Sequence, residues 1–239
     1  MDDLDLASLR VDYSGDTGDG LLEADLAPTP LEQFRRWFAE VEGSPLVPEP
    51  NAVVLATVDA QGLPDARTVL LKGVDARGFS FYSNHRSAKG AQLAAVPAAA
   101  LVLPWHGVQR QVRVRGAVEH LPRAESAAYF ASRPWGSQVG AWASEQSSVV
   151  GSREELAAAW AARAAQWPSD GSRGPVPLPE HWGGYLVRPV EVELWVGRAS
   201  RLHDRLVYLP VVQPAGAGGA GGVPALDDPA GWRVVRRQP

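Results

Sequence analysis

The spacing of apolar residues over residues 29–41 is that of a helix with one buried face. The apolar positions recur every three or four residues, at Leu31, Phe34, Phe38 and Val41. Thr29 and Pro30 come directly before them, and both residue types favour a helix start, the threonine as N-cap and the proline at the first position. The pattern therefore predicts a helix that begins at about residue 30 and covers a core.

From residue 51 the period shortens to that of β-strands. Residues 52–58 and 98–104 are apolar runs. Residues 108–118 alternate valine with glutamine and arginine, so one face is apolar and the other polar. Gly- and Asp-containing turns separate several of these runs from their neighbours. Short strands joined by tight turns, without a regular alternation of strand and helix, predict an antiparallel sheet or barrel.

The rest of the pattern predicts further helices, strands and two irregular segments. Helices are expected over residues 87–95, 122–131 and 152–167, strands over 67–72, 79–83, 182–187, 190–195 and 232–235, and a loop over 168–179. Residues 213–229 are rich in Gly and Ala, so we expect a flexible insert there. We expect a single domain over residues 29–239, preceded by an N-terminal segment over residues 1–28.

Composition excludes several classes of site. The chain has 239 residues and a net charge of −4, which gives no sign of a nucleic-acid-binding surface. It contains no Cys, and therefore neither a disulfide nor a thiol nucleophile. No apolar run is long enough for a membrane span, and the acidic start lacks the features of a signal peptide. We therefore expect a soluble cytoplasmic protein without a membrane partner.

Lysine is rare, and both lysines lie in one short stretch. The chain has 21 Arg but only Lys72 and Lys89, and the strand that ends at Lys72 begins at Arg67. Lysine is a compact charge with rotatable donors, whereas arginine is a planar fork, so the two are not equivalent at a crowded anion site. The stretch indicates an anionic ligand laid across the sheet; the alternative is an accident of composition.

Tyr129, Arg133 and Ser137 predict a cup for a phosphate. Tyr129 and Arg133 share a face at the end of the 122–131 helix, and Ser137 follows in a Gly-containing loop. A guanidinium fork with a phenol and a hydroxyl suits one anion. The alternative is an arginine that only offsets the negative end of the helix dipole. Gln146 and Ser147 suit either a phosphate or an ordinary loop.

Arg201, His203 and Arg205 alternate along the chain near its end. In an extended strand all three would face one side, which favours a phosphate or a flavin-like anion. The alternative is a solvated charged edge. Trp195, shortly before them, suits either stacking on a ring system or packing in a core, and the chain has nine tryptophans.

Taken in order, these motifs resemble those of pyridoxamine 5′-phosphate oxidases. They are Arg67 to Lys72, Phe81-Tyr82-Ser83-Asn84, Ser87 with Lys89, Pro104-Trp105, Arg110-Gln111, Tyr129 with Arg133-Pro134, Ser137 to Trp142, Gln146-Ser147-Ser148, Pro177 to Gly184, and Glu193 with Trp195 followed by Arg201 to Arg205. The resemblance covers nearly the whole chain.

The resemblance implies a homodimer of antiparallel split β-barrels that holds FMN at the subunit interface. Members of that family oxidise pyridoxamine or pyridoxine 5′-phosphate to pyridoxal 5′-phosphate, and oxygen then reoxidises the flavin and releases hydrogen peroxide. The small-molecule partners implied are therefore FMN, a vitamin B6 phosphate and O₂. The substrate and the cofactor each have a phosphate, which agrees with two cationic groups in the sequence.

The resemblance also implies a role for individual residues. The cofactor-binding residues would be Arg67, Thr68, Val69, Leu70, Leu71, Lys72, Tyr82, Ser83, Lys89, Gln111, Gln146, Ser147, Trp195 and Arg205. The substrate phosphate would lie among Lys72, Tyr129, Arg133 and Ser137. Arg201 and His203 would stand over the pyridine ring as catalytic groups that position and polarise it. Arg10 and Tyr13 would close the site as a lid.

One position departs from the family pattern. Residue 88 is Ala where similar sequences have Arg, which removes one expected contact to the FMN phosphate and makes Arg86 the candidate replacement. Two other functions stay open. One is a related FMN oxidase of another substrate, such as a phenazine-pathway intermediate. The other is a non-catalytic protein that binds flavin or pyridoxal phosphate.

Overall fold

The fold is described from a computed structural model, which describes residues 6, 9, 13, 20–212 and 222–239. The strands are β1 (Ala52–Val58), β2 (Pro64–Asp75), β3 (Gly78–Asn84), β4 (Ala98–Trp105), β5 (Arg110–His120), β6 (Trp182–Val196), β7 (Asp204–Pro210) and β8 (Trp232–Arg236). The α-helices are α1 (Pro30–Val41), α2 (Ala88–Ala95), α3 (Arg123–Ser132), α4 (Trp135–Ala143) and α5 (Arg153–Gln166). Short 3₁₀ turns are η1 (Glu23–Asp25), η2 (His106–Val108) and η3 (Ala199–Arg201).

Six of the strands close into an antiparallel barrel. The sheet order is β3-β2-β1-β4-β5-β6-β7-β8, and an additional pairing of β3 with β6 joins the first strand to the sixth. Every one of these pairings is antiparallel. The prediction of an antiparallel barrel is therefore confirmed, and β7 and β8 extend the sheet beyond it.

Strand β6 connects the barrel to this extension. Residues 182–187 pair with β3, and residues 192–196 pair with β7. We predicted two strands here, but β6 is one continuous strand of 15 residues. Its register against β5 shifts, because Pro189 faces Gly116 while Glu191 faces Arg115. A bulge of this kind accommodates a proline, which has no N–H to donate to the ladder.

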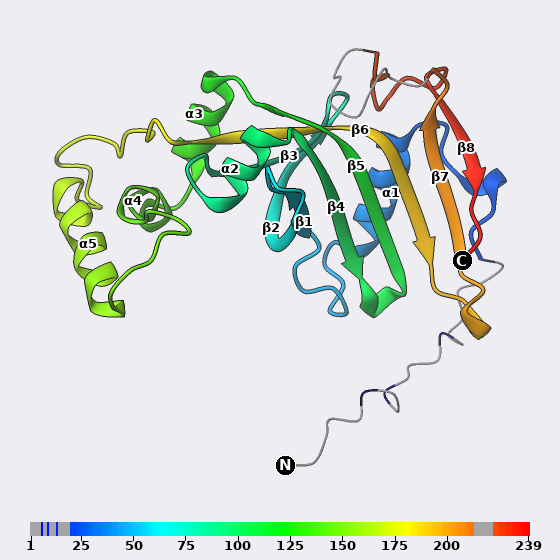
Figure 1. Ribbon diagram of the computed structural model, residues 1–239, viewed down its shortest axis with the longest axis horizontal. Coiled ribbons are helices and arrows are strands. Elements are labelled where there is room, and N and C mark those ends of the chain that lie inside the picture. The colour runs from blue at the N-terminus through cyan, green and yellow to red at the C-terminus, as the bar shows by residue number, and fades with distance from the viewer. Residues whose placement is uncertain (1–5, 7–8, 10–12, 14–19, 213–221) are drawn as a thin grey trace.

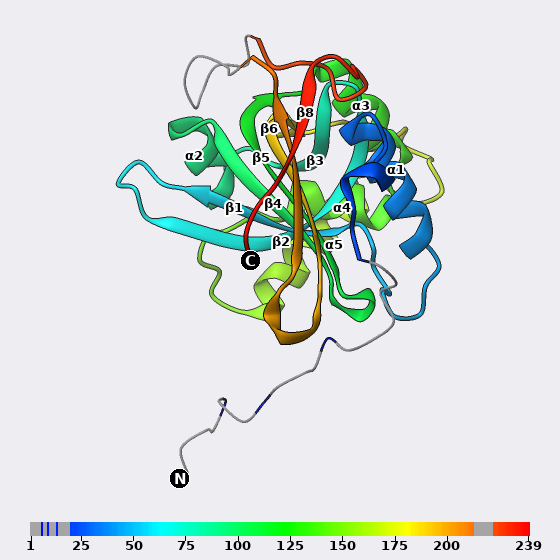
Figure 2. The same cartoon turned by 90° about the vertical axis from the view of Figure 1, so that its right-hand side faces the viewer.

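Helix α1 begins as predicted and covers one side of the barrel (Figure 2). The Thr29 hydroxyl accepts a hydrogen bond from the backbone N–H of Glu32 over 3.2 Å, which caps the helix. Phe34 then packs edge-on against Phe79 of β3, with ring centroids 5.1 Å apart. The barrel interior contains alternating strand residues with no exposed surface, among them Leu55 and Leu101.

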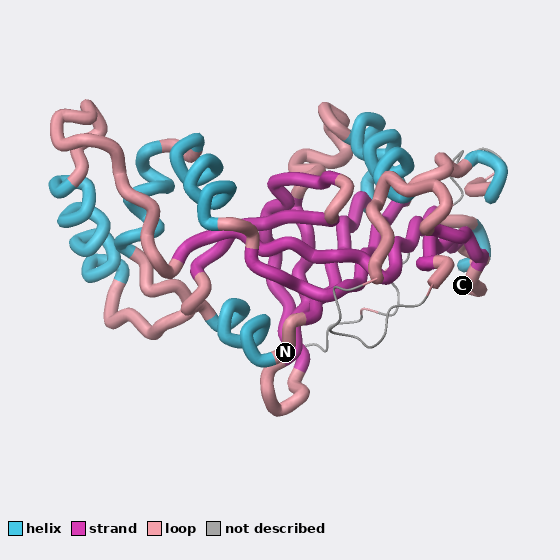
Figure 3. Tube along the Cα trace, turned by 90° about the horizontal axis from the view of Figure 1, so that it is seen from above, coloured by secondary structure: helices cyan, strands magenta, loops and turns pink. Residues whose placement is uncertain are grey.

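The helices α3, α4 and α5 lie toward one end of an elongated molecule, and β7 and β8 lie at the other (Figures 1 and 3). Strand β6 runs from the first end to the second, so its two termini are far apart (Figure 1). Within the described residues, no helix combines the length and the apolar character that crossing a membrane requires.

The expected flexible insert is only partly outside the described residues. Residues 213–221 are not described, but the expectation is wrong for residues 222–229. Leu226 has no exposed surface. Its N–H donates to the carbonyl of Ala76 over 2.8 Å, and its carbonyl accepts from the N–H of Leu31 over 3.1 Å. One leucine thus anchors a segment whose composition alone suggests no order.

Candidate functional site

A cavity of about 670 Å³ lies between β2, β3 and the helices α2, α3 and α4. It brings together twelve of the residues predicted for the site: Arg67, Thr68, Val69, Leu70, Lys72, Tyr82, Ser83, Lys89, Tyr129, Arg133, Ser137 and Gln146. We call this the main cavity. Residues predicted for the cofactor and for the substrate phosphate therefore face one space.

The main cavity is strongly cationic. Arg67, Lys72, Lys89 and Arg133 all line it, and its described lining includes no Asp or Glu. Like charges gathered around one cavity create a positive potential that attracts anions. The lining therefore suits a ligand, or two ligands, with more than one anionic group.

Lys89 lies in the first turn of α2 and is 8% exposed. Its Nζ donates to Gln146 Oε1 over 2.9 Å and to Ser87 Oγ over 3.3 Å. Burial, and then the positive charge of Arg67, lower the pKa of Lys89. A bound anion would stabilise the charged form of Lys89 and so raise its pKa again. The N-terminus of α2 also offers backbone N–H groups and the positive end of the helix dipole to an anion.

Arg67 is held by neighbouring side chains on β1 and α2. One guanidinium nitrogen donates to the Thr57 hydroxyl over 2.6 Å, and the other donates to Gln92 Oε1 over 3.0 Å. Asp65 also forms an ion pair with Arg67. Because these partners fix the fork, Arg67 presents its charge to the main cavity in one orientation.

Lys72 occupies a β-bulge. Leu71 faces Phe81 on β3 while Gly73 faces Ser80, so Lys72 is the extra residue between the two pairs. A bulge re-aims a side chain relative to the regular pleat. Leu71 is 5% exposed and packs in the core, whereas Lys72 lines both the main cavity and a groove beside α1.

Arg133 and Tyr129 stand against an aromatic wall. The guanidinium carbon of Arg133 lies 4.7 Å from the ring centroid of Trp182, and the rings of Tyr82 and Tyr129 are stacked 4.1 Å apart. Burial lowers the pKa of Arg133, and its Nη1 is a buried donor without a hydrogen-bond partner among the described residues. Buried donors are normally paired, so this nitrogen fits an anion that binds there.

Ser137 does not lie in a loop as predicted. It belongs to α4, which begins directly after Pro134. The proline ends α3, but its fixed φ also suits the start of the next helix, so two helices meet at a corner. The corner turns Arg133 and Ser137 toward the main cavity, where both are lining residues.

Three other predicted cofactor residues form a row across the extension of the sheet. Gln111 of β5 lies opposite Trp195 of β6, and Trp195 lies opposite Arg205 of β7. Residues directly opposite in neighbouring strands point to the same face. None of the three lines the main cavity as the structure describes it. We call them the Trp195 row.

Tyr13, Arg201 and His203 gather next to the Trp195 row. The His203 ring lies 4.7 Å from Trp195 and 5.5 Å from Tyr13, and the Arg201 guanidinium carbon lies 5.4 Å from the Tyr13 ring. His203 Nδ1 accepts a hydrogen bond from the backbone N–H of Arg198 over 3.0 Å. Burial, and then the charge of Arg201, lower the pKa of His203.

The extended triplet predicted at residues 201–205 is wrong. Arg201 ends the 3₁₀ turn η3 with a φ of 63°, and β7 begins only at Asp204. A positive φ is unusual for arginine and changes the direction of the chain there. Arg201 and His203 therefore cluster around Tyr13, while Arg205 joins the Trp195 row.

The main cavity and the Trp195 row share no described lining residue in one chain. Trp182, in the cavity, and Trp195 lie at opposite ends of β6. At about 3.3 Å per residue, the strand between them measures roughly 40 Å. Much of the cavity lining comes from β2, which lies three strands away from β5 and Gln111 in the sheet.

Three further residues with a predicted part in the site lie elsewhere, and a fourth, Arg10, is outside the described residues. Ser147 is exposed, has a φ of 77° and does not line the main cavity. The Leu71 side chain points into the core. Arg86, the candidate replacement for the missing arginine at position 88, lines a neighbouring cavity.

From the sequence, no role was assigned to several residues that hold the predicted binding residues in place. Trp182 forms the aromatic wall behind Arg133, and it stands in a Trp-Gly-Gly motif that contributed to the resemblance. Gln92 fixes Arg67 through a hydrogen bond that no local pattern reveals. Glu193 accepts a hydrogen bond from Arg205; it belongs to a sequence motif with Trp195, but no role was predicted for it.

Comparison with known families gives matches to both halves of the chain. Residues 41–167 match the family described as pyridoxamine 5′-phosphate oxidase. Residues 182–239 match the family described as the pyridoxine 5′-phosphate oxidase C-terminal dimerisation region. The second match contains the whole Trp195 row except Gln111.

Curated relatives extend this similarity to almost the full length. A protein of Kineococcus radiotolerans is 53% identical over 98% of this chain and 99% of its own length. A protein of Burkholderia multivorans is 50% identical, again over 98% of this chain and 99% of its own. Both are named pyridoxine/pyridoxamine 5′-phosphate oxidase.

Solved structures share the fold. PhzG from Burkholderia lata, in complex with tetrahydrophenazine-1-carboxylic acid, superimposes with a TM-score of 0.76 at 27% identity, over 92% of this chain and 98% of its own. A pyridoxamine 5′-phosphate oxidase-related, FMN-binding protein from Nostoc punctiforme gives a TM-score of 0.63 at 18% identity, over 90% and 100% of the two chains. This second likeness concerns the fold alone.

Proposed function

The chain belongs to the pyridoxamine 5′-phosphate oxidase family and is an oxidoreductase, and on this basis we propose its substrates and cofactor. It oxidises pyridoxamine 5′-phosphate and pyridoxine 5′-phosphate to pyridoxal 5′-phosphate. When bound, FMN supplies the acceptor for two electrons, which pass to O₂ and give hydrogen peroxide. With the amine substrate, water is also taken up and ammonia is released.

One observation carries this proposal: two predicted cationic groups line the same cavity. Lys72 and Arg133, assigned to the substrate phosphate, face the main cavity together with Arg67 and Lys89, assigned to FMN. Cofactor and substrate each have a phosphate, so a site that holds both needs two such groups. The buried Nη1 of Arg133, which has no hydrogen-bond partner among the described residues, fits the substrate phosphate.

The remaining residues of the site orient the substrate. His203 Nδ1 accepts a backbone hydrogen bond, so in the neutral ring the proton is on Nε2, which acts as a donor. The lowered pKa of His203 favours this neutral form. His203 and Arg201 thereby position and polarise the pyridine ring, and Tyr13 packs beside them and excludes water.

The site is completed by a second copy of the chain. Because the described residues of the Trp195 row do not line the main cavity of their own chain, we place the row of one subunit over the cavity of the other. The match of residues 182–239 to a dimerisation region supports this arrangement. The active unit is then a homodimer with FMN at its interface.

A visible absorption spectrum tests the proposal. Purified protein should show the bands of oxidised FMN, and anaerobic pyridoxamine 5′-phosphate should bleach them within one turnover. Admission of air should restore the bands and yield pyridoxal 5′-phosphate and hydrogen peroxide. A colourless protein that gains no bands with added FMN, and forms no product, contradicts the proposal.

The same experiment separates the two other functions. Bands that stay unbleached by either B6 phosphate would identify a protein that binds flavin without catalysis. The structural likeness to PhzG makes a phenazine precursor the second substrate to test. The cup formed by Lys72, Tyr129, Arg133 and Ser137 favours the phosphate substrates, because a substrate without a phosphate leaves its cations unpaired.

A further inference from the structure

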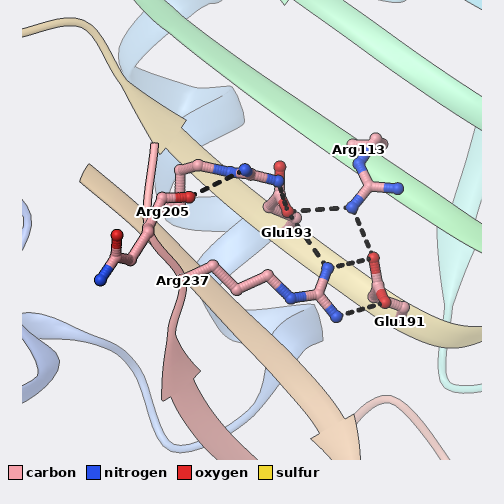
Figure 4. A network of polar contacts seen from close by, with 6 residues as sticks. Arg113, Glu191, Glu193, Arg205 and Arg237 are labelled. Atoms are coloured by element: carbon pink, nitrogen blue, oxygen red, sulfur yellow. Dashed lines mark hydrogen bonds and ion pairs between the residues drawn. The ribbon is translucent and has the colours of Figure 1, made fainter. Parts of the chain in front are cut away.

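Figure 4 shows a partly buried ion-pair network that includes Arg205 of the Trp195 row. It consists of Arg113, Glu191, Glu193, Arg205 and Arg237, and we call it the β6 network. The side chains at positions 191, 193 and 195 of β6 share one face, because alternate residues of a strand point the same way. The two glutamates of the network therefore share a face of β6 with Trp195.

Glu193 is the hub of the β6 network. Its side chain is 3% exposed, and its Oε2 accepts from Arg205 Nη2 over 2.8 Å and from Arg113 Nη2 over 2.9 Å. Arg237 Nη1 approaches the same oxygen at 3.5 Å. In Figure 4 the three guanidinium groups surround this carboxylate from different strands and from the chain beyond β8.

Glu191 pairs with only two of these arginines in the described structure. Its carboxylate accepts from Arg113 over 2.5 Å and from both terminal nitrogens of Arg237 over 2.9 and 2.8 Å. Glu193 is therefore the one described carboxylate that contacts Arg205. The two glutamates are neighbours on one face of β6 and share Arg113 and Arg237, but among the described residues Glu193 alone of the two also holds Arg205.

Charge keeps Glu193 ionised in spite of its burial. Burial alone would raise its pKa, but hydrogen bonds and charges from Arg113 and Arg205 outweigh this and lower the pKa. The five side chains comprise three guanidinium groups and two carboxylates, so the network has a net charge of about +1. Arg205 is the arginine of the network that lies in the Trp195 row.

We propose that Glu193 is a positioning residue that fixes the Arg205 guanidinium for the cofactor; this rests on the proposed function. Arg205 is attached through Nη2 to Glu193 and through Nη1 to the Gln238 carbonyl over 3.0 Å. These two bonds engage two of the five donors of a guanidinium. A guanidinium group that is already fixed in this way loses little further conformational entropy when it binds an anion.

Substitution at the two neighbouring glutamates tests the inference. Glu193→Gln removes the charge that holds Arg205, and Glu191→Gln removes one charge from the same network without touching Arg205. FMN affinity is measured by fluorescence titration of the deflavinated full-length dimer. We expect Glu193→Gln to weaken FMN binding roughly ten- to a hundredfold, the range of a charged hydrogen bond, and Glu191→Gln about twofold or less.

A double-mutant cycle distinguishes positioning from a general structural role. If Glu193 acts through Arg205, Glu193→Gln should cause little further loss of FMN affinity in an Arg205→Lys background. Equal losses in the two backgrounds overturn the inference, as do equal effects of Glu193→Gln and Glu191→Gln. Melting temperatures of each variant show whether the fold is retained.

Two controls keep the outcome decisive. If Glu193→Gln does not fold, Glu193→Asp takes its place, because it keeps the charge but draws the carboxylate back from Arg205. Wild-type FMN affinity in the Glu193→Asp variant overturns the inference.

The wild-type protein is titrated first. A wild-type protein without FMN affinity overturns the proposed function itself, whereas normal wild-type binding with insensitive Glu193 variants overturns only the role of Glu193.

Discussion

Lys89 Nζ donates a hydrogen bond to Gln146 Oε1 over 2.9 Å and so joins the first turn of α2 to the segment that follows α4. The same oxygen accepts from the Ser83 hydroxyl over 3.1 Å. Both acceptors of Lys89, Gln146 and Ser87, are neutral. The contact thus fixes two walls of the main cavity while the lysine charge stays available to an anion.

Lys89→Met should weaken FMN binding by about ten- to a hundredfold, because it replaces a buried cation by an apolar side chain of similar length. Fluorescence titration of the deflavinated protein measures the effect. Arg86→Ala is the matched control. Arg86 lines the neighbouring cavity, so this variant should keep FMN affinity within about twofold. A larger loss for Arg86→Ala than for Lys89→Met would mean that Arg86 replaces the arginine missing at position 88.

Arg133→Ala should raise the KM for pyridoxamine 5′-phosphate by about ten- to a hundredfold, since one charged hydrogen bond to the substrate phosphate is lost. FMN content should stay near that of the wild type, because the proposed FMN cations Arg67 and Lys89 are unchanged. Steady-state kinetics and the flavin-to-protein absorbance ratio measure both effects. A colourless Arg133→Ala protein would show that the two phosphate positions are assigned in the wrong order.

Acid should destabilise the protein through His85. Its ring packs against His120 and Tyr185, with centroids 4.5 and 5.1 Å away. Burial, followed by the charges of His120 and Arg123, lowers the pKa of His85 to about 4. Because this folded-state pKa is depressed, the unfolded chain binds the proton more readily, and stability is lost as the pH falls from about 6.5 toward 4.

Urea unfolding at pH 7 and pH 5 measures this loss. Linkage sets an upper limit of about 3 kcal/mol for the whole titration and of about 2 kcal/mol between pH 7 and pH 5, and solvent screening of the partly buried ring reduces both. His85→Gln should flatten the dependence on pH, whereas His106→Gln, in the exposed turn η2, should keep the wild-type slope. If the slope survives His85→Gln unchanged, the acid sensitivity has another origin.

Leu226→Ala should lower the free energy of unfolding by about 2–5 kcal/mol, because it leaves a cavity at a fully buried position. Val212→Ala, at a residue that is 75% exposed, should change it by less than about 0.5 kcal/mol. Chemical denaturation monitored by tryptophan fluorescence compares the two. Equal, small effects would show that residues 222–229 contribute nothing to the fold.

The sequence by itself determined those features that depend on local periodicity and residue chemistry. Apolar spacing predicted α1, and Thr29 caps it as expected, because a helix start is decided within a few residues. Alternation along β5 predicted the apolar face that now has Val112 and Val114 in the core. The order of the motifs was enough to identify the family, since residue types and their spacing can be read directly from the sequence.

Only the tertiary structure decided what depends on distant parts of the chain. The 3₁₀ turn at Arg201 and the bulge at Lys72 come from pairing and chain direction that spacing does not encode. Glu193 was part of a sequence motif but had no predicted role, and only the fold brings Arg113, Arg205 and Arg237 around it. The Trp195 row lies outside the described lining of the main cavity, because contacts between distant segments, and not spacing along the chain, decide which residues meet.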